Sequence, residues 1–304
     1  MNRLTKIPGA ADLLRRLYHN NRAARSVLTW PVALRRRVLS GRGAKAYTIV
    51  KRLGDVIVDD VVLTLPEFLG QFAMSAKSDL FRRVAIDGVY ESEMTKLVRR
   101  YLVPTRDFID IGANVGFYSV MAARLLDTGR VLAVEPNQEA HSRLLQNLER
   151  NGVTNKVIVF QGLASNQLGE ATLYHIPGME EYSSMGKIIH SSVRDKSAVT
   201  SSAPTSTVDS LVAEHELNPG FIKIDVEGAE MLVLAGSIET LKRHRPIVLS
   251  ELSPALLGPM GSSAEAIISL FESLRYTVTD ANDPKLRPGT RDYGDILCVP
   301  EEIA

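Results

Sequence analysis

A glycine-containing turn is the first feature of the sequence that could bind a small molecule. It lies at the end of the apolar stretch 108–111 and contains Asp110, Gly112, Asn114 and Gly116. In doubly wound sheets, ligands bind outside the carboxyl ends of the strands, where a glycine turn allows the backbone to approach them. Compared with the dinucleotide-binding pattern, this turn has an acid before it and lacks the middle glycine. Because a carboxylate repels phosphate but accepts a hydrogen bond from an ammonium group, the turn favours an amino acid group over a dinucleotide.

A second candidate is the carboxylate that follows the next apolar strand. Glu135 comes directly after the run 131–134, precedes Pro136 and lies 19 residues beyond Gly116. An acid about 20 residues after such a turn is placed to accept hydrogen bonds from two ribose hydroxyls. A ligand with both an amino acid group and a free ribose is S-adenosylmethionine, which we therefore predict as the cofactor.

Further carboxylates follow two later apolar strands. Asp225, Glu227 and Glu230 follow the first of these strands, and Glu251 ends the next. Carboxylates at adjacent strand ends can act as a general base, bind a hard cation such as Mg²⁺, or do both. For Glu227 and Glu230, the alternative is a structural role at the amino end of a helix, stabilised by its dipole. Lys223 shares a strand face with Asp225, so we expect it to pair with a neighbouring carboxylate.

Together these motifs resemble the FkbM family of S-adenosylmethionine-dependent methyltransferases. The similarity extends from about Tyr90 to about Glu251, roughly half of the chain. The segments that carry it are 110–119, 135–137, 164–165, 207–209 and, most specifically, 223–230 with the sequence Lys-Ile-Asp-Val-Glu-Gly-Ala-Glu. The resemblance implies a seven-stranded methyltransferase fold. It also implies O-methylation of a hydroxyl on a sugar or on a glycosylated or macrolide-like natural product.

Two sets of candidate site residues follow from the motifs and the resemblance. The candidates for cofactor binding are Asp110, Gly112, Asn114, Gly116, Glu135, Pro136, Ala164 and Asp225. The candidates for catalysis are Asp225, Glu227 and Glu251, of which Asp225 and Glu251 could also bind a metal ion. The sequence does not distinguish a direct carboxylate base from one that acts through Mg²⁺.

Short apolar strands alternate with helical segments after Pro104, which predicts a mostly parallel sheet covered on both faces. The predicted strands are 108–111, 131–134, 157–160, 171–174, 221–224, 247–249, 276–280 and 295–299. The predicted helices are 91–101, 115–126, 138–150, 208–214, 229–244 and 264–275. The fold class is therefore α/β, a doubly wound Rossmann-like sheet with an antiparallel edge strand in the closing hairpin.

Residues 175–204 interrupt this alternation with a Pro-Gly pair and three pairs of serines. A loop of about 30 residues within a compact domain is usually functional or disordered. Because the segment follows the third strand and its extension, we expect a lid over the substrate in preference to a disordered surface loop.

The composition is that of a globular protein. Of the 304 residues, 45% are hydrophobic and 23% are charged, which excludes collagen-like, coiled-coil and wholly disordered chains. Cys298 is the single cysteine, so an internal disulfide and a multi-thiolate zinc site are excluded, and we expect it in the core. The sequence contains no apolar run of membrane-spanning length and no signal-peptide pattern, which predicts a cytoplasmic location.

Charge is unevenly distributed along the chain. Residues 1–52 contain 13 Lys and Arg and a single acid, a net charge of +12, whereas the remainder carries −11. Two basic amphipathic helices, around Leu13 and after Trp30, are expected in this part. They could pack on the domain, bind an anionic membrane surface or, least favoured, bind RNA.

The sequence divides into three parts. They are a basic arm at 1–46, a small β unit and helix at 47–104, and a methyltransferase domain at 105–304 with the insertion 175–204. Two other functions stay open on the sequence alone. One is a nicotinamide-dependent oxidoreductase, although the acid and the missing glycine in the turn count against it. The other is a non-catalytic membrane-associated protein on the same scaffold. For an enzyme, the predicted partner is a small-molecule, glycan or glycolipid acceptor.

Overall fold

The computed structural model describes residues 60–87, 89–186 and 197–303. The predicted basic arm and the first part of the β unit after it lie outside these ranges, and the division into three parts stays a prediction. Within the described ranges, no helix is long and apolar enough to cross a membrane. Cys298 is fully buried, as expected.

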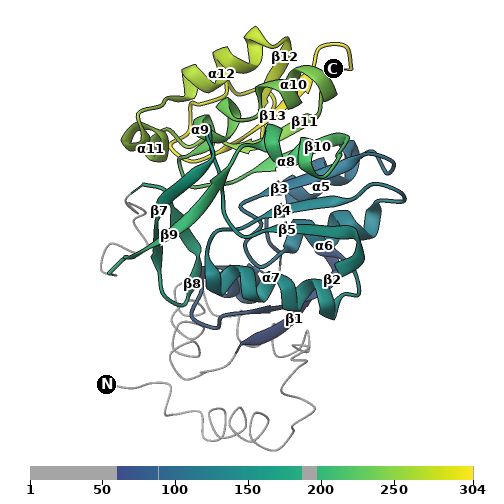
Figure 1. The fold of residues 1–304 in the computed structure, drawn as a ribbon, viewed down its shortest axis with the longest axis vertical. Coiled ribbons are helices and arrows are strands. Elements are labelled where there is room, and N and C mark those ends of the chain that lie inside the picture. The colour runs from purple at the N-terminus through teal and green to yellow at the C-terminus, as the bar shows by residue number, and fades with distance from the viewer. Residues whose placement is uncertain (1–59, 88, 187–196, 304) are drawn as a thin grey trace, which may run out of the picture.

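The centre of the fold is a seven-stranded sheet with the strand order β12-β13-β11-β10-β3-β4-β5 (Figure 1). Its strands are β3 (Asp107–Ile111), β4 (Val131–Val134), β5 (Val157–Phe160), β10 (Pro219–Ile224), β11 (Ile247–Glu251), β12 (Tyr276–Asp280) and β13 (Asp295–Pro300). Pairing is parallel from β5 through β4, β3 and β10 to β11, whereas β13 is antiparallel to both of its neighbours. The predicted mostly parallel α/β fold is confirmed, and the antiparallel strand of the closing hairpin lies next to the edge.

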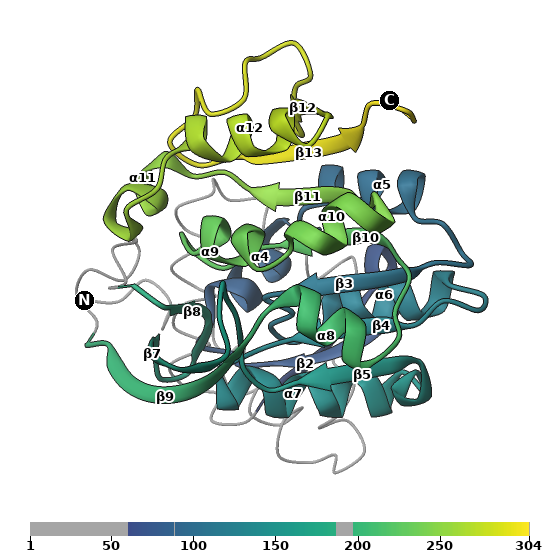
Figure 2. The ribbon, with the colours of Figure 1, turned by 45° about the horizontal axis from the view of Figure 1, so that its top comes forward.

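Helices cover both faces of this sheet because successive strand residues point to opposite sides. The helices are α5 (Ser92–Tyr101), α6 (Phe117–Leu125), α7 (Gln138–Arg150), α8 (Val208–Glu214), α9 (Glu230–Ala235), α10 (Ile238–His244) and α12 (Ala264–Ser273). Phe108 and Phe221 pack in one core with α5, α6 and α7. Ile109 and Ile222 pack in the other core with α8, α9, α10 and α12, and α8, α9 and α10 lie in front of the sheet in Figure 2.

An antiparallel hairpin packs on α6 and α7 and supports the turn that follows β3. It consists of β1 (Val61–Leu65) and β2 (Gly70–Met74). Phe72 lies edge-on to Phe117 of α6, with ring centroids 4.7 Å apart. The hairpin lies within the segment 47–104, where the sequence predicts a small β unit. β2 and the following helix α4 (Asp79–Asp87), elements of five and nine residues, are not predicted from the sequence.

A second sheet stands beside the central one (Figure 1) and has the strand order β6-β9-β7-β8. Its strands are β6 (Leu163–Ala164), β7 (Gly169–Ile176), β8 (Met179–Ser184) and β9 (Val199–Ser206). The expectation of an irregular loop over 175–204 is therefore wrong for the described part of that segment. The first four residues of β9 are all exposed, so this strand lacks the apolar alternation that identifies a strand in a sequence.

The single helix expected over 229–244 is two helices, α9 and α10. The interruption falls at Gly236 and Ser237, where the Ser237 hydroxyl donates a hydrogen bond of 2.6 Å to the carbonyl of Val233. A Cβ atom on Gly236 would collide with the carbonyl oxygen of Ser165. Close packing against the end of β6 therefore needs glycine at the position where the helix breaks.

Candidate active site

A pocket lies at the carboxyl ends of β3, β4 and β10, where the topology of a doubly wound sheet places ligands. Its empty volume, including the part that is open to solvent, is about 910 Å³. The predicted site residues that line it are Gly112, Asn114, Glu135, Pro136, Ala164, Asp225 and Glu227. Asp110, Gly116 and Glu251 do not line it.

Two glycines with positive φ shape the turn after β3. The φ angles are +77° at Gly112 and +90° at Gly116. A Cβ atom on Gly112 would collide with the backbone oxygen of Asp225, and one on Gly116 would approach Leu144 of α7 within 2.6 Å. The missing Cβ atoms make room for neighbouring parts of the protein, and Gly112 also lines the pocket, as the sequence predicts. These glycines let the turn pack against β10 and α7.

Glu135 is held at the end of β4 by two backbone groups. It is 4% exposed, and its Oε2 and Oε1 accept hydrogen bonds of 2.8 Å from the N–H groups of Asn114 and Asn137. Burial raises the pKa of Glu135 to about 7, although these two hydrogen bonds oppose the shift. A carboxylate offers about four lone-pair positions, so Glu135 can still accept hydrogen bonds from ligand hydroxyls.

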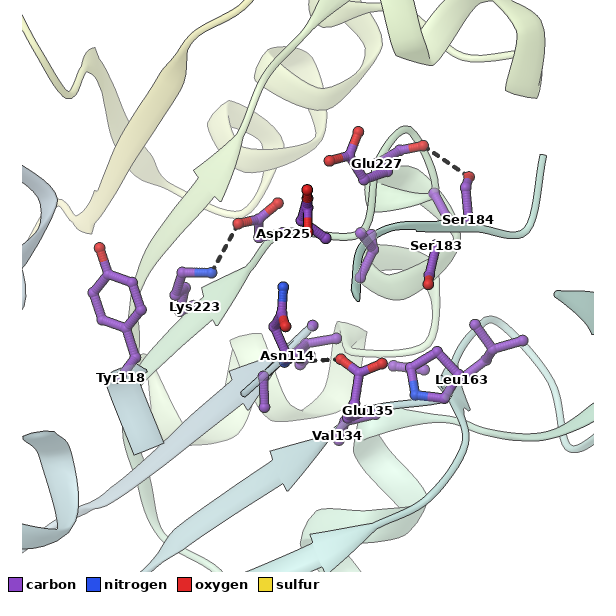
Figure 3. Close-up of a pocket in the computed structure, with 18 of the residues that line it drawn as sticks. Asn114, Tyr118, Val134, Glu135, Leu163, Ser183, Ser184, Lys223, Asp225 and Glu227 are labelled. Carbon is purple, nitrogen blue, oxygen red and sulfur yellow. Dashed lines mark hydrogen bonds and ion pairs between the residues drawn. The ribbon is translucent and has the colours of Figure 1, made fainter. Parts of the chain in front are cut away.

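Asn114 lies between Glu135 and Asp225 in Figure 3. Its φ is +50°, a left-handed value that asparagine tolerates better than most residues. The side-chain oxygen is buried and has no hydrogen-bond partner among the described residues. Since a buried polar atom without a partner is costly, this oxygen is suited to accept a hydrogen bond from a ligand.

Asp110 lies beneath the pocket and does not line it. It is 1% exposed, and its Oδ2 accepts a hydrogen bond of 2.6 Å from the hydroxyl of Ser119. Its Oδ1 is buried without a hydrogen-bond partner among the described residues. Burial raises the pKa of Asp110, while Lys223 and Ser119 lower it. The expectation that Asp110 binds a ligand ammonium directly therefore does not fit its position, because strand alternation turns the side chain towards the α6 face.

Lys223 pairs with a carboxylate, as expected. Its Nζ lies 3.0 Å from Oδ2 of Asp225 and 4.9 Å from the centre of the Tyr118 ring (Figure 3). Burial alone would lower the pKa of Lys223, but Asp225, Asp110 and Glu91 together raise it above its ordinary value. The neighbouring carboxylates thus favour the charged form of Lys223, and its partner Asp225 lines the ligand space.

Glu227 lines the pocket beside Asp225, in the turn after β10. It has a positive φ of 54°, and its backbone oxygen accepts a hydrogen bond of 2.9 Å from the hydroxyl of Ser184. Burial, followed by the charges of Asp225 and Glu230, raises the pKa of Glu227 to about 8, and Arg83 opposes this shift. A carboxylate with a pKa near neutrality is suited to general acid–base catalysis.

Glu230 and Glu251 lie behind this turn. Oε1 of Glu230 accepts hydrogen bonds from the N–H groups of Val226 and Gly228, which is the structural role at a helix start considered above. Glu251 accepts a hydrogen bond of 2.8 Å from Ser253, and burial followed by the charge of Glu227 raises its pKa well above the ordinary value. Within the described part of the chain, no group of three or more His, Cys, Asp and Glu residues is arranged to bind a metal. The structure thus gives the predicted metal site at Asp225 and Glu251 no support.

Several pocket residues were not singled out from the sequence. Tyr90, Glu91 and Tyr118 line the end near Lys223, and Glu181, Ser183, Ser184 and Met185 form a wall contributed by β8 and the residue after it. β8 is fixed to the N-terminal part, since Glu181 accepts a hydrogen bond from the N–H of Asp79 and the Tyr182 hydroxyl donates one to the Asp79 carboxylate. This part of the predicted lid is a wall of the pocket. The remainder, 187–196, lies outside the described residues.

Comparison with known proteins decides the family. The model of the methyltransferase FkbM domain matches residues 110–278, more than half of the chain. The chain belongs to the FkbM methyltransferase family. This membership agrees with the resemblance of the sequence motifs and disfavours the oxidoreductase alternative.

Two curated proteins and one solved structure illustrate the similarity. A methyltransferase named sdnD from Sordaria araneosa is 26% identical over 203 residues, which are 58% of this chain and 76% of that protein. A ribosomal protein L11 methyltransferase from Pelotomaculum thermopropionicum is 42% identical over 67 residues, 22% of this chain and 21% of that protein. The crystal structure of an FkbM methyltransferase from Methylobacillus flagellatus matches with a TM-score of 0.42 and 16% identity. That match covers 64% of this chain and less than half, 43%, of the other chain.

Proposed function

We propose that this FkbM-family protein is an S-adenosylmethionine-dependent O-methyltransferase that acts on a hydroxyl of a sugar or of a glycosylated or macrolide-like natural product. The observation that carries the proposal is the presence of Glu135, Asn114 and Asp225 in one pocket at the strand ends, with Glu227 beside Asp225. This arrangement places hydrogen-bond acceptors for a ribose at one end of the pocket. At the other end it places a carboxylate that can act as a general base.

The residues present fit this cofactor. Glu135 would accept hydrogen bonds from the ribose hydroxyls, and Pro136 and Ala164 line the same end of the pocket. The unpartnered oxygen of Asn114 offers a further acceptor. At the other end, Glu91, Asp225 and Glu227 surround the ligand space with carboxylates, which suits a positively charged ligand. When bound, S-adenosylmethionine supplies a methyl group on a positively charged sulfur.

Within this proposal, Glu227 acts as the general base. Its carboxylate takes the proton of the acceptor hydroxyl as the oxygen becomes a nucleophile, a type of assistance that contributes about 10²- to 10⁴-fold in rate. Asp225 and the wall of β8 position the acceptor, and close positioning of oxygen and methyl carbon at about 3–3.5 Å supplies much of the remaining barrier reduction. Glu251 lies behind Glu227 and is not assigned a contact with the substrate.

The proposal is tested by binding and by product analysis. Calorimetry should detect binding of S-adenosylmethionine and no binding of NAD. Incubation with a set of glycosides and glycosylated macrolides should then yield a product heavier by one CH₂ group, with the methyl group on oxygen by NMR. The control is the matched deoxy compound without the methylated hydroxyl, which should not react. A methyl group found on carbon or nitrogen would contradict O-methylation while leaving the family assignment intact.

A further inference from the structure

Glu91 is a pocket carboxylate outside the matched FkbM domain, and the sequence motifs assign it no role. It lines the pocket together with Lys223 and Asp225. Its Oε2 accepts a hydrogen bond of 2.8 Å from the hydroxyl of Tyr118, whose ring also contacts the Lys223 amine. Glu91 thus belongs to the same polar network as the predicted site residues, although it comes from the N-terminal part of the chain.

The backbone at Glu91 is unusual for its residue type. Its φ and ψ are +46° and +48°, the left-handed region, at the position just before α5. A glutamate in this position could cap the helix, but its side chain makes no capping hydrogen bond and is directed into the pocket network instead. Left-handed conformations of residues other than glycine are concentrated at functional sites, where the surrounding structure holds them.

The charges around Lys223 leave room for a cationic ligand. Glu91, Asp110 and Asp225 all act on Lys223 electrostatically. Three carboxylates surround this one ammonium group, and Arg83 is a further cation that acts on Glu91. S-adenosylmethionine has an ammonium, a sulfonium and a carboxylate group, so its net positive charge suits this carboxylate-rich end of the pocket. Asp110 lies beneath the pocket floor, so Glu91 and Asp225 are the members of this set that line the ligand space.

We propose that Glu91 binds the ammonium group of the methyl donor, so that the part of the chain before the FkbM domain completes the cofactor site. The inference rests on the proposed function. It assigns Tyr118 the part of a positioning residue, which orients the Glu91 carboxylate through its hydroxyl. Lys223 keeps its ion pair with Asp225 and so restricts the rotation of the Asp225 carboxylate beside the ligand.

The test compares two ligands that differ at the amino acid end. 5′-Methylthioadenosine has the adenine and ribose but neither the ammonium nor the sulfonium group. Glu91→Gln should weaken binding of S-adenosylmethionine at least tenfold in calorimetry and leave binding of 5′-methylthioadenosine unchanged. Glu93→Gln is the matched control, because Glu93 is an exposed residue of α5 that pairs with Lys96, and it should bind both ligands as the wild type does.

Tyr118→Phe provides a second variant that keeps the ring over Lys223 and removes only the hydrogen bond to Glu91. Tyr118→Phe should lose less affinity than Glu91→Gln, and it should lose affinity for S-adenosylmethionine alone. This variant serves as the test if Glu91→Gln does not fold. If Glu91→Gln binds S-adenosylmethionine with unchanged affinity, the inference is overturned. An equal loss of affinity for both ligands also overturns it, because that result indicates a distorted pocket. If the wild-type protein itself fails to bind S-adenosylmethionine, the proposed function fails as well, so the two failures are distinguishable.

Discussion

Among single residues, Glu227 should determine how activity depends on pH. With a pKa raised to about 8 by burial and by Asp225, Glu227 is mostly protonated at pH 7 and cannot accept a proton. Turnover at saturating cofactor should therefore rise with pH up to about 8 and then level off. Glu227→Gln should remove this rise and lower kcat about 10²-fold or more. Steady-state kinetics from pH 6 to 9.5 measures both effects.

Glu251→Gln is the matched control for this experiment. Glu251 does not line the pocket, and its Oε1 accepts a hydrogen bond from the Ser253 hydroxyl. A glutamine of nearly the same shape at this position should therefore leave the rise of turnover with pH in place. A flat pH profile for the wild type would contradict the role of Glu227 as the base. An equal loss of kcat in Glu227→Gln and Glu251→Gln would contradict it as well.

Glu135 should contribute to affinity for any ligand that carries the ribose. Each hydrogen bond to a charged group is worth roughly 1.5–3 kcal/mol, and about 1.4 kcal/mol corresponds to a factor of ten. Glu135→Ala should therefore weaken the binding of both S-adenosylmethionine and 5′-methylthioadenosine at least tenfold in calorimetry. Glu149→Ala, at an exposed position of α7, is the control. Unchanged affinity for 5′-methylthioadenosine would contradict the ribose assignment and distinguish Glu135 from Glu91.

At the scale of elements, Asn147 of α7 joins the β2 strand to the turn after β3. Its side chain accepts a hydrogen bond from the N–H of Ala73 and donates to the carbonyls of Ala73 and Val115. Asn147→Ala leaves these buried groups unpaired, at about 1–3 kcal/mol for each. We expect a loss of several kcal/mol in the free energy of unfolding and weaker cofactor binding. Chemical denaturation should show the loss, whereas Gln146→Ala, at an exposed position of the same helix, should have little effect.

The elements that could be predicted from the sequence are those that form a continuous apolar run. β3, β4 and β10 are buried along their whole length, so each stands out as an apolar run. β9 and β8 were missed because partly exposed polar strands have no such run, and a single helix was expected where Gly236 divides α9 from α10. At the site, Glu135 and Asp225 follow directly from strand ends. Glu91 does not, because its position depends on long-range packing of α5 against the sheet.

The placement of Asp110 shows a second limit. Its spacing to Gly112 identified the turn correctly, but alternation along β3 directs its side chain to the α6 face, where Ser119 binds it. A strand end predicts which residues lie near a ligand. The packing of the following turn decides whether the last residue of a strand or the one before it faces the pocket. Here that turn packs through Gly112 against the backbone of Asp225.

At the scale of the whole molecule, the charge distribution separates a basic segment from an acidic body. Residues 1–52 carry +12 and the remainder −11. The carboxylates of the pocket belong to the acidic part, which would attract the cationic cofactor. The basic segment would be drawn instead to an anionic surface, and Trp30 with the leucines around it adds apolar side chains suited to the headgroup region.

We propose that this segment brings the enzyme to an anionic membrane surface where a lipid-linked sugar acceptor is found. Each Lys or Arg near such a surface contributes about 1 kcal/mol, and salt screens the attraction beyond about 8 Å at physiological ionic strength. Deletion of residues 1–42 should release the protein from anionic vesicles and reduce activity on a lipid-borne acceptor more than on a soluble fragment of it. Vesicle sedimentation at low and high salt measures the binding, with neutral vesicles as the control. Full-length protein that stays in the supernatant at low salt would show that the basic segment has another role, and packing against the domain would then be the better explanation of its apolar residues.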